Sequence, residues 1–320
     1  MGDTISNTLY ILGAGFTRAA NGKAPLNREL LEAMMAVNPD PLNKYRDKYQ
    51  STDIERILTL IYLDADTNSH SRDDLKLIDN QIANYFTRFR FDPQTAPAWV
   101  SRFSKNVLQP NDSILCLNYD CYLEGALDHF KVWSPNGGYP INHPLADDIM
   151  GNPRNIKIYK IHGSEHFRES RVIGSTGTDI SFLINESNFP ESGRNKHFGC
   201  GLDSKPYVVA PSFVKDFHVG IAWMMLRLLE IAKEARNLVI IGCGMRREDS
   251  FLWLVLTRFL FGNPKDTKKK LIIVDPSSVD ILNRMELYAG DISELADVVS
   301  IPSGIEDGTA DLMATMGYSS

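Results

Sequence analysis

The 320-residue sequence is long enough for one large domain with insertions, and its 43% hydrophobic and 23% charged residues are ordinary values for a globular protein. These proportions exclude a disordered chain and provide ample apolar side chains for a large core. The formal net charge of −6 argues against direct nucleic-acid binding, which needs clustered Lys and Arg side chains.

The cysteine pattern and the apolar segments bear on metal binding and location. The sequence has four scattered cysteines: Cys116, Cys121, Cys200 and Cys243. No pair has C-x-x-C spacing, so we expect no bound metal, and free thiols are typical of the reducing cytoplasm. The most apolar helical stretches, at 217–229 and 251–261, are too short to cross a bilayer, so we expect no membrane association.

The first third of the chain is predicted to be one strand followed by helices. A short buried strand is expected over 8–12. Helical patterns follow at 16–20, 27–37, 53–63, 75–91 and 98–108. No strand-like run interrupts residues 23–109, so we interpret 23–110 as a helical insertion.

Strand and helix patterns alternate in the rest of the chain. Strands are expected at 113–117, 156–161, 237–242, 271–274 and 298–301. Helices are expected between and after them, at 122–129, 219–235, 248–261, 279–288 and 308–316. Hydrophobic strands that alternate with helices are typical of an open parallel sheet that is buried on both faces.

Two segments break this alternation. Residues 134–155 and 164–205 are rich in Gly, Pro, Asn, Ser and charged residues, which predicts a small loop-rich lobe. The expected fold is therefore α/β, a Rossmann-like open parallel sheet with a helical insertion and this lobe. We expect residues 1–320 to form a single domain, without a separate sensor domain.

A glycine-rich turn, with the sequence GAGFT, follows the first strand. Gly13 and Gly15 would let backbone N–H groups approach a phosphate at the start of a helix. Arg18 stands where a dinucleotide-binding turn has its third glycine, and no second strand ending in an acid follows about 20 residues later. A tight turn without a ligand explains the motif equally well.

An Asn-Tyr-Asp motif follows the expected strand at 113–117. The carboxyl end of a strand in an open α/β sheet faces the ligand crevice. The carboxamide of Asn118 could orient a water or a ribose hydroxyl without carrying charge. Asp120 could cap the next helix, which is the simpler explanation for that residue.

A His-Gly-Ser motif follows the expected strand at 156–161. His162 is suited to general-base catalysis, because an unperturbed imidazole titrates near neutral pH. A purely structural histidine is the equal alternative. His166 lies four residues further on, but a loop would not bring both rings to one face, so the pair does not predict a metal site.

Two further strand ends carry polar or glycine residues. A second glycine turn, with Gly242 and Gly244, follows the strand at 237–242. Asp275 ends the strand at 271–274, where an acid could hold a ribose diol through paired hydrogen bonds. Capping of the next helix is the alternative role for Asp275.

Taken in order, these motifs resemble the sirtuin-like (SIR2-like) superfamily over residues 8 to about 280. Sirtuins have a Gly-Ala-Gly-x-Ser turn, then Asn-Ile-Asp, His-Gly and a Gly-Thr-Ser type turn. The matching residues here begin at Gly13, Asn118, His162 and Gly242, and Asp275 stands in place of an Asn-bearing strand end. The forms are most similar to the bacterial branch, many of whose members hydrolyse NAD in antiphage defence.

The sequence also departs from the family pattern. The four-cysteine zinc module of the deacetylating sirtuins is absent, since the sequence has no C-x-x-C. Ala24-Pro25-Leu26-Asn27-Arg28 replaces their Ile-Pro-Asp-Phe-Arg segment. Because the zinc lobe supports the peptide cleft of sirtuins, these departures argue against protein deacylation and leave NAD binding and glycosidic cleavage intact.

The resemblance implies an NAD+ hydrolase that releases nicotinamide and ADP-ribose. Asn118 would position the water or the ribose, and His162 would accept a proton. The implied cofactor-binding residues are Gly13, Ala14, Gly15 and Thr17 at the diphosphate, Gly242 and Gly244 close to the cofactor, Asp275 at the adenosine ribose, and Asp120, which would orient the loop of Asn118.

Two other function classes stay open: an NAD-dependent protein deacylase and a non-catalytic NAD- or nucleotide-binding sensor. NAD is the expected ligand in all three classes. Because uncontrolled NAD hydrolysis would kill a host cell, we expect control through a homo-oligomer or a separately encoded activating protein.

Overall fold

The computed structural model describes residues 7–135, 137–141, 153–171, 178–195, 205–212, 217–247, 249–262 and 268–318. Its centre is a six-stranded sheet with the order β3-β2-β1-β7-β8-β9, in which all pairs are parallel. The strands are β1 (Thr8–Leu12), β2 (Ser113–Cys116), β3 (Lys157–Tyr159), β7 (Asn237–Ile241), β8 (Lys269–Val274) and β9 (Ala296–Ile301). The sheet confirms the expected α/β fold with an open parallel sheet.

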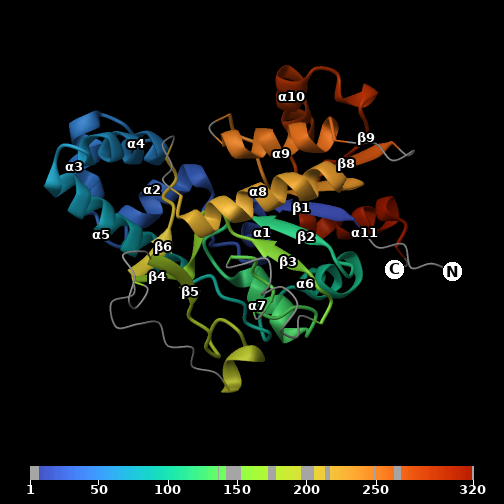
Figure 1. Cartoon of the computed structure of the whole chain (residues 1–320), viewed down its shortest axis with the longest axis horizontal. Coiled ribbons are helices and arrows are strands. Elements are labelled where there is room, and N and C mark those ends of the chain that lie inside the picture. Colours follow the sequence, from blue (N-terminus) through green and yellow to red (C-terminus); the bar gives the residue numbers. More distant parts are fainter. Residues whose placement is uncertain are drawn as a thin grey trace.

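Helices cover both faces of this sheet (Figure 1). They are α1 (Ala14–Ala20), α6 (Ala98–Arg102) with a π-helical turn (Phe103–Val107), α7 (Tyr122–His129), α8 (Val219–Glu234), α9 (Ser250–Leu260), α10 (Ser278–Ala289) and α11 (Ile305–Met316). Helix α11 packs against α1 and α6, and α8 packs against α9. Strands such as β1, whose five residues are all buried, form the main core between these layers.

Four helices form a separate lobe at one side of the sheet, at the left of Figure 1. They are α2 (Asn27–Met35), α3 (Leu42–Tyr49), α4 (Ile54–Ala65) and α5 (Ser69–Phe86). The lobe has its own hydrophobic core, which includes Ile57, Ile61 and Ile78. Helix α5 begins six residues before the expected start at 75, because Asn68 caps it by accepting a hydrogen bond from the backbone N–H of His70 (3.0 Å).

A second, three-stranded antiparallel sheet lies where we expected loops at 164–205. Its order is β5-β4-β6, formed by β4 (Gly163–Arg171), β5 (Thr178–Phe182) and β6 (Lys205–Val208). The polar residues Ser164, Glu165 and His166 of β4 are almost fully buried, so hydrophobic alternation did not indicate this strand. Parts of the expected lobe, Cys200 and Glu248 lie outside the described residues.

No helix in the described ranges is both long and apolar enough to cross a membrane.

Candidate functional site

The predicted site residues all follow carboxyl ends of strands in the parallel sheet. Register pairs Leu12 with Cys116 on one side and with Ile241 on the other, so these strand ends lie at the same edge. The chain order reverses between β1 and β7, and such a switch point is where open α/β sheets bind ligands. The fold is thus a doubly wound sheet, and its two glycine turns lie at the switch point.

The two glycine turns pack directly on each other. The N–H of Gly15 donates to the carbonyl of Gly242 at 2.9 Å, and the N–H of Gly13 donates to that of Ile241 at 3.0 Å. A Cβ on Gly13 would lie 2.5 Å from the Gly242 oxygen, and one on Gly15 would lie 2.7 Å from the Gly242 Cα. Gly242 itself has a φ of 58°. Packing alone therefore requires glycine at these three positions.

Gly244 differs from the other three glycines. A Cβ at this position would meet nothing within 4 Å, and its φ is not in the left-handed region. Its carbonyl accepts a hydrogen bond from Arg284 Nη2 at 2.7 Å, and the residue is exposed. No contact among the described residues requires a glycine here, so the backbone is open to a ligand.

The side chain of Asn118 is held at the end of β1. Its Nδ2 donates to the carbonyl of Gly13 at 3.0 Å and to Thr17 Oγ1 at 2.9 Å. Within the described part of the chain, no group donates to its Oδ1. The amide is therefore oriented through its nitrogen, and its oxygen remains available as an acceptor.

Asp120 lies behind this amide. Its Oδ1 accepts from Thr17 Oγ1 at 3.1 Å and from the backbone N–H of Tyr122 at 3.0 Å. Burial raises the pKa of this carboxyl to about 6, although the neighbouring Lys160 opposes the rise. Asp120 thus joins α1 to Tyr122, the first residue of α7, although Cys121 is the residue at the cap position of that helix.

A fully buried ion pair contacts the loop that carries Asn118 and Asp120. Lys160 Nζ lies 2.7 Å from Glu124 Oε1, and both side chains are completely covered. The ammonium also donates to the carbonyl of Asp120 at 2.6 Å. Burial alone would lower the pKa of Lys160, but the nearby Cys116, Glu124 and Asp120 raise it above its usual value, so the lysine stays charged.

His162 lies three residues beyond β3, at the carboxyl edge of the sheet. Its side chain is 12% exposed, and Nε2 is 4.0 Å from Asp249 Oδ1. The ring of Tyr119 is tilted beside it at a centroid distance of 6.4 Å. The backbone N–H of Val209 donates to the His162 carbonyl at 2.8 Å, and Tyr119 Oη donates to the Val209 carbonyl at 2.7 Å. The loop after β2 and the loop after β3 are thereby connected.

Asp275 is not brought together with these residues. It follows β8, and its Oδ1 accepts from the backbone N–H of Ser277 at 2.8 Å, directly before α10. Ser277, and not Asp275, is the residue that precedes α10, so Asp275 forms a turn before the helix and does not cap it. The half-buried side chain remains at the carboxyl edge of the sheet, two strands from β1.

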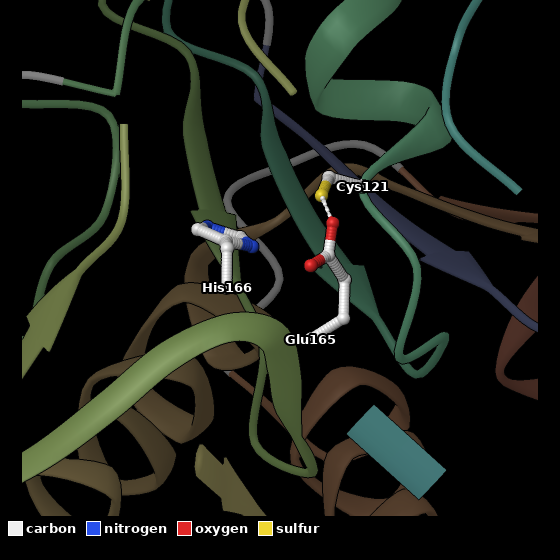
Figure 2. Close-up of side chains that lie close together, drawn as sticks. All are labelled: Cys121, Glu165 and His166. Carbon is white, nitrogen blue, oxygen red and sulfur yellow. Dashed lines mark hydrogen bonds between the residues drawn. The ribbon is translucent and has the colours of Figure 1, made fainter. Parts of the chain in front are cut away.

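The sequence did not indicate a buried cluster of Cys121, Glu165 and His166, which Figure 2 shows. Their donor atoms lie within 4.8 Å of one another, and these residue types can bind zinc. Glu165 is already paired, however, since Arg90 binds both of its oxygens at 2.9 Å and the thiol of Cys121 lies 2.6 Å from Oε1.

The remaining member of the cluster, His166, sits among aromatic rings. Both ring nitrogens are buried without a hydrogen-bond partner among the described residues. Burial, followed by the positive charges of Lys160, Arg168 and Arg90, lowers the pKa of His166 well below its usual value. A cation here would meet the same three positive side chains, so the donor set does not favour a metal centre.

No protein-family model and no curated protein matches the sequence. Solved structures that are similar to this chain include Sir2 homologues. A Sir2 homologue in complex with NAD has a TM-score of 0.44 and 13% identity, and the match covers 98% of this chain and 90% of that one.

Two further structures match at a comparable level. Sir2Tm bound to a propionylated peptide has a TM-score of 0.42 at 9% identity, covering 98% of this chain and 94% of that one. A mutant Sir2 homologue bound to ADP-ribose has a TM-score of 0.42 at 14% identity, covering 98% and 92%. Similarity at this level does not transfer an activity to this chain.

Proposed function

We propose that the protein is a SIR2-like NAD+ hydrolase of the cytoplasm that cleaves the nicotinamide–ribose bond, as an effector of antiphage defence. The observation that carries the proposal is the fixed amide of Asn118. Its nitrogen is bound by Gly13 and Thr17, so its oxygen is directed by the same turn that is predicted to bind the diphosphate. His162 follows the neighbouring strand β3 at the same edge.

The reaction consumes NAD+ and water and yields nicotinamide, ADP-ribose and a proton. The C–N bond breaks and its electron pair leaves with nicotinamide, which becomes neutral, while the ribose develops oxocarbenium character as in other glycosyl transfers. Water then forms the new C–O bond. Asn118 Oδ1 accepts a hydrogen bond from this water or from a ribose hydroxyl, and His162 takes up the proton and later releases it to solvent.

The remaining predicted residues bind or support the cofactor in this proposal. The diphosphate would lie over the first turn of α1, at Gly13, Ala14, Gly15 and Thr17. The N–H groups of Gly13 and Gly15 already donate to the carbonyls of Ile241 and Gly242, so these two glycines would act by their small size and not as phosphate donors. Gly242 and Gly244 let the cofactor approach the second turn, and Asp275 binds the adenosine ribose. Asp120 acts indirectly, because its carboxyl holds Thr17 and the start of α7. No metal takes part in this proposal.

The test is turnover of NAD+ by the purified protein, with nicotinamide and ADP-ribose both measured. Loss of a general base typically costs 10²- to 10⁴-fold, so we expect His162→Ala to reduce kcat by about 100-fold or more, and Asn118→Ala to reduce it comparably. The exposed residues His70 and Asn84 on α5 give the matched controls His70→Ala and Asn84→Ala. Unchanged turnover in both site variants would overturn the assignment.

Two additions to the assay address the alternatives and the control of activity. An acetyl-lysine peptide that accelerates nicotinamide release and yields O-acetyl-ADP-ribose would favour a deacylase. Binding of NAD+ without cleavage under any condition would favour a sensor. A steep dependence of specific activity on protein concentration would support control by homo-oligomer formation, and activation by a second protein would support the separately encoded partner.

A further inference from the structure

Asp249 occupies the residue before α9, yet it does not behave as a helix cap. An Asp at this position usually accepts a hydrogen bond from the first backbone N–H groups of the helix. The side chain of Asp249 makes no such bond. Its Oδ1 instead lies 4.0 Å from Nε2 of His162, and the carboxylate is only 22% exposed.

The segment that carries Asp249 is anchored on several sides. The backbone N–H of Asp249 donates to the carbonyl of Arg246 at 3.2 Å, and Trp253 Nε1 donates to the same carbonyl at 2.9 Å. The Arg246 guanidinium is 2.9 Å from Glu55 Oε1 in the helical lobe. Met245, just before, is buried with a φ of 45°, a conformation that non-glycine residues rarely adopt. These contacts fix the position of the segment, and with it the position of the Asp249 carboxylate.

We propose that Asp249 is a positioning residue for His162, a role that rests on the proposed hydrolase function. Its negative charge holds the imidazole in orientation and stabilises the imidazolium that forms when His162 accepts the proton from water. Asp249 remains ionised throughout, and the proton leaves from His162 to solvent. A carboxylate that orients a catalytic histidine performs the same service in the hydrolytic triads of unrelated enzymes.

In the described part of the chain, His162 lies beside the carboxylate of Asp249 and the ring of Tyr119, whose hydroxyl donates to the Val209 carbonyl. Arg246, in the same segment as Asp249, is paired with Glu55. The approach of Asp249 to His162 therefore brings the start of α9 next to the loop after β3.

The decisive variant is Asp249→Asn, compared with wild type between about pH 5 and pH 9. Loss of the negative charge lowers the pKa of the histidine, so the acid limb of the kcat/KM profile moves to lower pH. We expect kcat to fall by about 10- to 100-fold, with KM for NAD+ changed by less than about threefold. Asp249→Glu should recover part of the loss. Asp280→Asn, in the exposed first turn of α10, is the matched control.

A second measurement separates this inference from the hydrolase proposal. NMR titration of the His162 ring, assigned by comparison with His162→Ala, needs no turnover. The inference is supported by a higher histidine pKa in wild type than in Asp249→Asn. An equal pKa in the two proteins overturns it, as does an unchanged kcat and pH profile. An unreactive wild type whose histidine pKa still depends on Asp249 counts against the hydrolase alone.

Discussion

The two sides of the candidate site differ in how far their ionisable side chains are exposed to solvent. Behind the loop of Asn118, the ionisable side chains of Asp120, Glu124 and Lys160 are at most 3% exposed. At the front, His162 and Asp249 keep partial contact with solvent and lie 4.0 Å apart. Because the buried charges do not reach solvent, we expect changes there to act first on folding, whereas changes at His162 and Asp249 should act on the proposed turnover.

The largest effect is expected from Lys160→Met. Removal of the ammonium leaves the buried Glu124 carboxylate without its cation, which typically costs about 3–5 kcal/mol of unfolding free energy. Urea unfolding measures the loss. The double variant Lys160→Met with Glu124→Leu should recover most of the stability, because an apolar pair of similar volume is often tolerated. A loss below about 1 kcal/mol in the single variant would contradict the importance of the pair.

Asp120 should make stability fall as pH rises from about 4 to 6. Its pKa is about 6 in the folded protein and near 3.8 when unfolded, so the folded state binds more protons in this window. The resulting destabilisation above pH 6 is about 3 kcal/mol. Asp120→Asn keeps an acceptor oxygen but removes the titration. The difference in unfolding free energy between variant and wild type should therefore grow across the window, and a constant difference would refute the assignment.

The packed glycine turn should respond more weakly. In Gly15→Ala, the new Cβ would lie 2.7 Å from the Gly242 Cα, and overpacking of this kind costs about 1–3 kcal/mol. Gly22→Ala is the control, because a Cβ there meets nothing within 4 Å. Thermal unfolding of both variants checks the prediction, which fails if the two are equally stable.

Gly244→Ala should have the smallest effect on stability, within about 0.5 kcal/mol, because the position is open. If the cofactor approaches this backbone as we propose, the added methyl should weaken NAD+ binding by about tenfold, as titration calorimetry would detect. Equal affinity in the variant and wild type would remove Gly244 from the proposed site. Paired with Gly15→Ala, this variant separates a glycine needed for packing from one left open for a ligand.

The parallel sheet could be predicted from the sequence because its strands are short apolar runs. Such a run can be recognised without knowing which strand it pairs with. Strands over 8–12 and 237–241 were recognised within a residue. Helix α3 was missed because its inward face uses Leu42 and Tyr45 among charged residues. Strand β4 was missed because its buried side chains include polar ones such as Glu165. The charge of Glu165 is paired with Arg90, which lies far away in the sequence.

The positions of the candidate site residues at strand ends could be predicted for the same reason, whereas their roles stay predictions. The strand-end residues Asn118 and His162 could be located by counting from apolar runs. Their partners could not, because Asp249 and Lys160 act through contacts that depend on how separate strands and helices assemble. The one local signal was the position of Asp249 just after the second glycine turn, but the helix expected at 248–261 placed it inside a helix.

Tyr119 belongs both to the loop that follows Asn118 and to the hydrophobic core of the helical lobe. Its ring lies 5.2 Å from that of Phe86 in α5 and 6.4 Å from that of His162. Val208 and Ala210, near the small sheet, complete the same core. The lobe is consequently part of the environment of the site: truncation of Phe86 would remove one aromatic neighbour of Tyr119, and we expect the loss to reach His162 through the Tyr119 ring.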